Sequence, residues 1–178
     1  TFFYGGSQQM NRLKQLQIVL LVLITICAFF FWAGHGFEVS SHQISGNGNP
    51  GILFAYIIVF LFPLIVLGII VLFYLIDARS LSLMTTIILA AIYTYIGYFH
   101  QRESYVTYQH LKRQHMIDAG LALDYIDDVL VGFSIYLNSQ FFNLNTFLIY
   151  ICLVLMTASA LYLLLSTMIR LIQIIRFR

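Results

Sequence analysis

Four long apolar stretches constrain this chain more than any other feature of its sequence. They cover roughly residues 16–32, 52–76, 81–99 and 147–169. Each is close to the ~20 residues that a helix needs to cross a ~30 Å hydrocarbon core. Within them the only ionisable side chains are cysteine thiols and tyrosine phenols. Lipid offers the backbone no hydrogen-bond partners, so the sequence predicts an all-α polytopic membrane protein with four transmembrane helices.

The composition agrees with a membrane location and limits what else the chain can contain. It is 61% hydrophobic and only 9% charged, outside the range of soluble domains. The four stretches take up about half of the 178 residues. Residues 1–178 are therefore expected to form a single membrane domain, without a separate soluble enzyme domain. The basic residues flank the apolar stretches and form no patch, so nucleic acid is not an expected partner.

The lysines and arginines predict the orientation. With a cytoplasmic N-terminus, the inner segments carry six of these residues and the outer segments carry three. The inner set is Arg12, Lys14, Arg79, Arg170, Arg176 and Arg178, and the outer set is Arg102, Lys112 and Arg113. This asymmetry follows the positive-inside rule. We expect a bacterial inner membrane or an organellar inner membrane, with both termini on the cytoplasmic or matrix side.

The outer segment 100–145 has the most varied chemistry. Between 115 and 137, apolar residues repeat every four positions and carboxylates lie among them. The apolar residues are Ile117, Leu121, Tyr125, Val129 and Phe133, and the carboxylates are Asp118, Asp124, Asp127 and Asp128. The spacing predicts an outer amphipathic helix. Anionic headgroups repel carboxylates, so we expect the stripe, with Asp127 and Asp128 at its rim, to bind another membrane-protein subunit.

Histidines offer an alternative chemistry. His35 and His100 each follow the outer end of an apolar stretch, and two histidines on separate helices are what axial haem ligation requires. Haem b at these residues is therefore an alternative to the expectation that no cofactor is bound. The pairs His100 with Glu103 and His115 with Asp118 are three residues apart. No strict ligand spacing accompanies them, and a metal site is not predicted.

Two further motifs carry less weight. The run from Tyr125 to Asp128 matches the YxDD of reverse transcriptases, but a four-span chain has no room for a polymerase sheet and its third carboxylate. Cys27 and Cys152 lie about five residues from the outer ends of their apolar stretches. No CxxC is present, so both thiols are expected to act as small buried hydrophobes.

No acid, lysine or arginine lies within the apolar stretches. Coupled transporters usually need such a group inside the membrane, so this class is disfavoured. The sequence favours a non-catalytic accessory subunit of a larger respiratory, photosynthetic or secretion complex. The first alternative is a stand-alone membrane helper such as a bacteriocin-immunity protein. The second is a haem or quinone anchor that uses His35 and His100.

Overall fold

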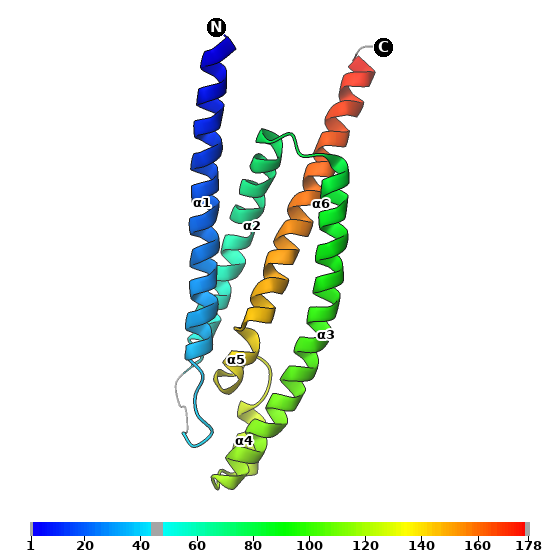
Figure 1. Cartoon of the computed structure of the whole chain (residues 1–178). Helices are drawn as coiled ribbons and strands as arrows, with labels where there is room; N and C mark the ends of the chain where they lie inside the picture. Colours follow the sequence, from blue (N-terminus) through cyan, green and yellow to red (C-terminus); the bar gives the residue numbers. More distant parts are fainter. Residues whose placement is uncertain (1, 44–47, 177–178) are drawn as a thin grey trace. The chain divides into compact units, whose positions relative to one another are not determined.

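The structure, a computed structural model, describes residues 2–43 and 48–176; Arg178, counted above among the inner basic residues, lies outside this part of the chain. In the described part all regular structure is helical (Figure 1). The long helices are α1 (Phe2–Gly36), α2 (Gly51–Leu75), α3 (Ser80–Asp118) and α6 (Leu144–Arg176). All four are long and apolar enough to cross a membrane. This confirms the prediction of an all-α, multi-pass membrane protein.

The ends of α2 follow from local chemistry. The Asn49 side-chain oxygen accepts a hydrogen bond from the Gly51 amide at 2.8 Å, which satisfies a donor that a helix N-terminus leaves free. Pro50, immediately before α2, has no amide hydrogen to lose there. At the other end, Asp77 has a φ of 50° and the Ala78 amide donates to the Phe73 carbonyl at 3.0 Å. That left-handed residue ends α2 and leaves only a short link before α3.

The described residues form two compact units, and each long helix contributes to both of them. Unit 2 consists of the described parts of Ile26–Phe60 and Tyr95–Tyr150, and unit 1 contains the rest. In unit 1, Ala158 and Ser159 of α6 are fully buried. A Cβ atom on Gly68 would lie 2.7 Å from Leu20 Cδ2. Small side chains thus let the helices of unit 1 approach closely.

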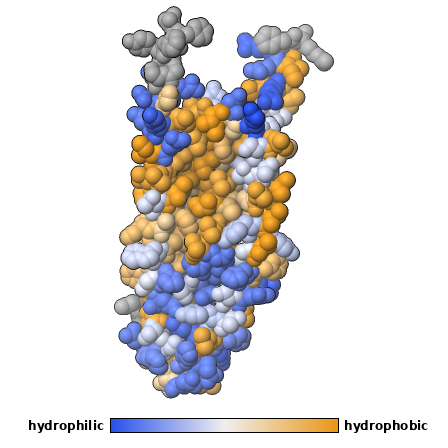
Figure 2. Space-filling model, in the orientation of Figure 1, coloured by the Kyte–Doolittle hydropathy of each residue, from blue (hydrophilic) through white to orange (hydrophobic). Residues whose placement is uncertain are grey.

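Unit 2 contains the outer segment and three shorter helices, α4 (Leu123–Val129), the 3-10 helix η1 (Ile135–Leu137) and α5 (Asn138–Phe141). Their core is a cluster of buried residues on α3, α4 and η1 and at the C-terminal cap of α4, namely Met116, Ile126, Leu130, Tyr136 and Leu137. Hydrophobic residues cover the middle of the long helices on the face shown in Figure 2, and hydrophilic residues gather over the segment that holds α4. The outer segment is therefore a folded part of the protein and not a simple connection.

The prediction of one amphipathic helix over 115–137 is wrong. α3 does continue to Asp118, but Gly120 (φ 78°) and Gly132 (φ 62°) turn the chain before and after α4. Glycine adopts these left-handed conformations without the penalty of a Cβ atom. The folded segment buries much of the apolar stripe within the chain itself. Leu121, Tyr125 and Val129 pack against the core cluster, and Phe133 contacts the rings of Phe141 and Phe142.

Candidate functional site: a buried polar network in unit 2

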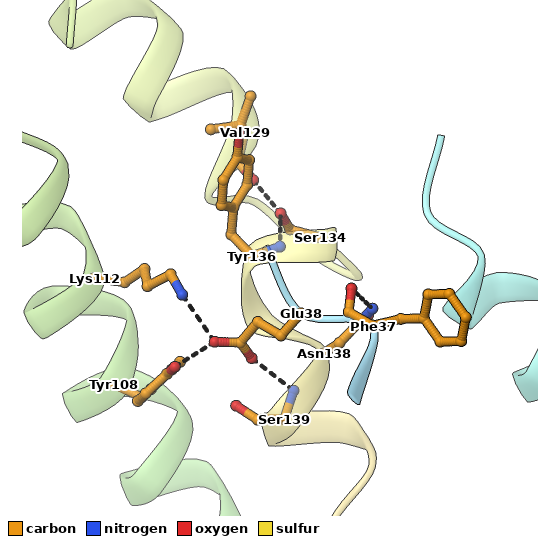
Figure 3. Close-up of polar contacts among 9 residues, drawn as sticks. All are labelled: Phe37, Glu38, Tyr108, Lys112, Val129, Ser134, Tyr136, Asn138 and Ser139. Carbon is orange, nitrogen blue, oxygen red and sulfur yellow. Dashed lines mark hydrogen bonds and ion pairs between the residues drawn. The ribbon is translucent and has the colours of Figure 1, made fainter. Parts of the chain in front are cut away.

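A carboxylate from the segment after α1 is the centre of a buried polar network (Figure 3). Glu38 Oε1 accepts hydrogen bonds from Lys112 Nζ at 2.8 Å and from the Tyr108 hydroxyl. Glu38 Oε2 accepts a hydrogen bond from the Ser139 amide at 2.8 Å. Tyr108 and Lys112 are one turn apart on α3, and Ser139 belongs to α5. One carboxylate thus connects three segments that are far apart in the sequence.

The ion pair in this network is largely shielded from solvent. The side chains of Lys112 and Glu38 are 9% and 13% exposed. Burial opposes ionisation of Glu38, but hydrogen bonds from Lys112, Ser139 and Tyr108 outweigh it and hold the pKa of Glu38 below its usual value. A buried ion pair is tolerated when further hydrogen bonds satisfy the charged atoms. Glu38 meets that condition, so it remains ionised at neutral pH.

A pair of asparagines forms a second part of the network. Asn49 Nδ2 donates to Asn138 Oδ1 at 2.8 Å, and Asn138 Nδ2 donates to Asn49 Oδ1 at 2.9 Å. Asn138 is fully buried. Asn49 also donates to the Phe133 carbonyl at 3.1 Å. The start of α2 is therefore tied to the start of α5 by reciprocal amide hydrogen bonds, which are specific in geometry and direction.

Amide side chains also join α3 to α5 and α6. Gln101 Nε2 donates to the Gln140 carbonyl at 2.7 Å, and the Ser104 hydroxyl donates to Gln140 Oε1 at 2.9 Å. Asn145 Nδ2, on α6, donates to the Gly97 carbonyl at 2.9 Å. Hydrogen-bonded networks of this kind make the surrounding structure rigid and specify one arrangement. The network holds α3, α5 and α6 in place, because its polar side chains form hydrogen bonds with one another and with the backbone.

The two predicted haem ligands line different cavities. His35 contacts the Phe142 carbonyl through Nδ1 at 2.9 Å and lines a cavity with Trp32 and Phe147. His100 lines another cavity with Glu103 and Tyr108. The structure does not bring the two imidazoles to a common pocket, and haem ligation by this pair stays a prediction. Among the residues described, no group of three or more His, Cys, Asp or Glu is placed to hold a metal ion.

The predicted partner-binding residues are only partly at the surface. Ile117 is 38% exposed, and Asp128 is exposed. Asp127 forms an exposed ion pair with Arg113 of α3. The sequence interpretation missed two other surface residues, Leu123 and Val131, which are 55% and 69% exposed at either end of α4. Their positions lie outside the four-residue repeat, so periodicity gave no signal for them.

The thiols lie where small hydrophobes are expected. Cys27 is buried and Cys152 is half-buried, and neither forms a disulfide. Cys27 Sγ lies 3.5 Å from the Tyr150 hydroxyl, and that hydroxyl donates to the Ile58 carbonyl at 3.3 Å. Within unit 2, this contact links α1, α2 and α6 through side chains of modest polarity.

The residues of the central network were also missed by the sequence interpretation. Glu38 is the only acid between 33 and 51, and Lys112 is the only lysine of the outer segments. Two oppositely charged residues that are each rare in their own segments were a signal for an ion pair. Nothing local in the sequence indicated that these two residues, 74 positions apart, would lie in contact.

These features define a multi-pass membrane protein in which residues 100–145 form a folded segment held by buried polar contacts. No family model matches the chain, and neither curated proteins nor solved structures gave a significant match.

Proposed function

We propose that this protein is a non-catalytic accessory subunit of a larger multi-subunit membrane complex, of the respiratory, photosynthetic or secretion kind. The observation that carries the proposal is the surface around α4. It exposes two large apolar side chains, Leu123 at 55% and Val131 at 69%. The carboxylates of Asp124 and Asp128 are exposed on the same short helix.

Apolar groups rimmed by charge are typical of protein interaction surfaces. Lipid is a poor alternative cover, since anionic headgroups repel the carboxylates and the segment 115–137 has no lysine or arginine. A partner with an apolar centre and a basic rim satisfies both features. Hydrogen bonds from the neighbouring segment support this role. The Ser134 hydroxyl donates to the Val129 carbonyl, and the Tyr125 and Tyr136 hydroxyls lie 2.7 Å apart. They hold α4 in place before a partner arrives and so reduce the entropy lost on binding.

Site-specific photo-crosslinking in native membranes tests the proposal. A photoreactive phenylalanine derivative at Val131 is expected to give one discrete crosslinked species larger than the 20.5 kDa chain. Reversing one rim charge, Asp128→Lys, is expected to remove that species by opposing the partner's basic rim. Glu103→Lys makes the same charge change at an exposed residue of α3 and serves as the matched control.

Two outcomes contradict the accessory-subunit proposal. One is a purified chain that is monomeric and fully active by itself, which favours the stand-alone helper. The other is a crosslink that survives Asp128→Lys, or that disappears equally in Asp128→Lys and in the control Glu103→Lys. Either result removes the α4 surface as the partner-binding site.

A further inference from the structure

A cavity in unit 2 is distinct from the polar network and from the α4 surface. Its volume is about 410 Å³, within the range of small-molecule sites. The lining residues are Ala28, Phe31, Trp32, His35, Phe142, Asn143, Leu144 and Phe147. Such a lining is apolar and strongly aromatic, with two polar side chains.

Only one of those two polar side chains has spare bonding capacity. Asn143 Nδ2 donates to the Ser139 and Gln140 carbonyls at 3.0 and 3.2 Å. Asn143 Oδ1 accepts from the Thr146 amide at 3.0 Å. The amide of Asn143 is therefore occupied by the turn that starts α6. His35 is the polar group that remains for a ligand.

The contact between His35 and Phe142 fixes which imidazole nitrogen carries the proton. The Phe142 carbonyl can only accept a hydrogen bond, so Nδ1 of His35, at 2.9 Å, must be the donor. In a neutral imidazole the other nitrogen, Nε2, is then an acceptor. Among the described residues Nε2 has no hydrogen-bond partner. A ligand at this nitrogen needs a donor, such as a hydroxyl group.

The cavity lies at the end of the apolar part of α1, where aromatic side chains mark the edge of a membrane. Trp32 is 73% exposed there. We propose that this cavity binds a small amphipathic molecule whose apolar chain or ring contacts the aromatic lining and whose hydroxyl donates to Nε2 of His35. A diacylglycerol and a membrane quinol share this chemistry. The proposal is independent of the accessory-subunit role.

The chain contains one tryptophan, and it lines the cavity. Bromine atoms quench indole fluorescence on contact, so Trp32 reports occupancy directly. The full chain in phosphatidylcholine nanodiscs is titrated with two probes, a diacylglycerol with brominated acyl chains and a benzoquinol with a brominated decyl tail. Each probe is compared with its fully O-methylated form, the methyl ether of the diacylglycerol and the dimethyl ether of the quinol, which has the same apolar body and no hydroxyl donor.

At least one hydroxyl probe is expected to quench Trp32 saturably, at a tenfold lower mole fraction than its ether. The probe that does so identifies the source of the ligand. His35→Phe is expected to abolish this preference, and His42→Phe, at an exposed histidine outside the cavity, is expected to retain it. Equal quenching by hydroxyl and ether probes, or an unchanged preference in His35→Phe, overturns the proposal.

A second variant keeps the proposal testable if His35→Phe fails to fold. Ala28→Leu places three further carbon atoms at the cavity wall and leaves His35 in place. Saturable quenching by the hydroxyl probes is expected to weaken at least fivefold. Unchanged quenching by the same probes means that the cavity is not the binding site.

Discussion

Glu38 accepts hydrogen bonds from α3 and α5, and its negative charge neutralises the buried ammonium group of Lys112. Glu38→Gln keeps the shape of the side chain and removes the charge. The variant leaves Lys112 as an uncompensated cation that is only 9% exposed. Breaking a buried pair in this way costs about 3 kcal/mol or more. We expect faster amide hydrogen exchange throughout α4 and α5, measured by mass spectrometry of the purified protein.

The ion pair of Asp127 with Arg113 is the matched control. Its side chains are 54% and 43% exposed, and exposed pairs contribute less than about 1 kcal/mol. Asp127→Asn is therefore expected to leave hydrogen exchange in α5 nearly unchanged. Similar protection losses in Glu38→Gln and Asp127→Asn would show that burial of the Glu38 pair has no particular role.

The same carboxylate predicts how stability depends on pH. The pKa of Glu38 is lowered in the folded protein, and an unfolded glutamate has a pKa of about 4.3. The stabilisation that comes from ionised Glu38 is thus fully present above about pH 4.3. It is lost as the pH falls through the pKa of Glu38 in the folded protein. The rate of limited proteolysis of the outer segment, measured between neutral pH and pH 3, is expected to rise once the pH falls below the pKa of Glu38 in the folded protein. In Glu38→Gln this acid-dependent part should disappear.

At the scale of elements, two glycines decide where the outer helices begin and end. Gly120 and Gly132 have positive φ, and a Cβ atom at either position would meet nothing within 4 Å. Any loss of stability in Gly120→Ala or Gly132→Ala therefore comes from the left-handed backbone conformation, which costs about 1–2 kcal/mol for a residue with a Cβ atom. Thermal unfolding of the outer segment is expected to shift downward in both variants.

Gly36 provides the comparison for these two variants. It also has open space around it, but it lies at the end of α1 with no positive φ. Gly36→Ala is expected to have little effect or to stabilise slightly, because alanine reduces the freedom of the unfolded chain. Equal destabilisation by all three substitutions would contradict a specific role for the left-handed turns.

The long helices could be predicted from the sequence because their signal is local. A run such as 52–76 has no other structure available in lipid, and α2 covers Gly51–Leu75. The interpretation of 115–137 was wrong because a four-residue repeat also fits a short helix between two turns. Gly120 and Gly132 were visible as isolated glycines, but their conformation depends on the packing of Ile126 and Leu137 in the core cluster.

At the scale of the whole molecule, the charge asymmetry predicts that both termini are cytoplasmic. Single cysteines are introduced at His42, Thr107 and Ser80 after Cys27 and Cys152 are replaced by alanine. All three positions are exposed. Cysteines at 42 and 107 are expected to react with a membrane-impermeant thiol reagent applied from the outer side. A cysteine at 80, the first residue of α3, is expected to react only after the membrane is permeabilised.

The opposite labelling pattern would reverse the orientation and place α4 on the cytoplasmic side. The positive-inside rule would then fail for this chain. The cysteine-free background is itself informative, since Cys27 is fully buried and its Sγ lies 3.5 Å from the Tyr150 hydroxyl. That hydroxyl keeps its hydrogen bond to the Ile58 carbonyl. Activity of the cysteine-free protein should therefore equal that of the unmodified chain.

The candidate site was much harder to predict than the spans. Asn49 and Asn138 are 89 positions apart, and each by itself looks like an ordinary turn residue. Their pairing depends on how α2 and α5 are brought together, which is a property of the tertiary structure. His35 was selected from the sequence as a haem ligand. Its contact with the Phe142 carbonyl, 107 positions away, had no local signal.

The sequence distances in this network also set an order of events during synthesis. Glu38 leaves the ribosome before Ser139, whose amide it binds, and 101 positions separate them. At ~5–20 residues per second, that separation corresponds to a delay of roughly 5–20 s. Glu38 has none of its three partners until Tyr108 is made, and Asn49 lacks Asn138 for nearly the whole interval. The residues of α2 and α3 are all made before the network can close. The outer segment therefore assembles late, after most of the chain has been inserted, and the newborn protein passes through a period in which an insertion factor or a protease can reach it.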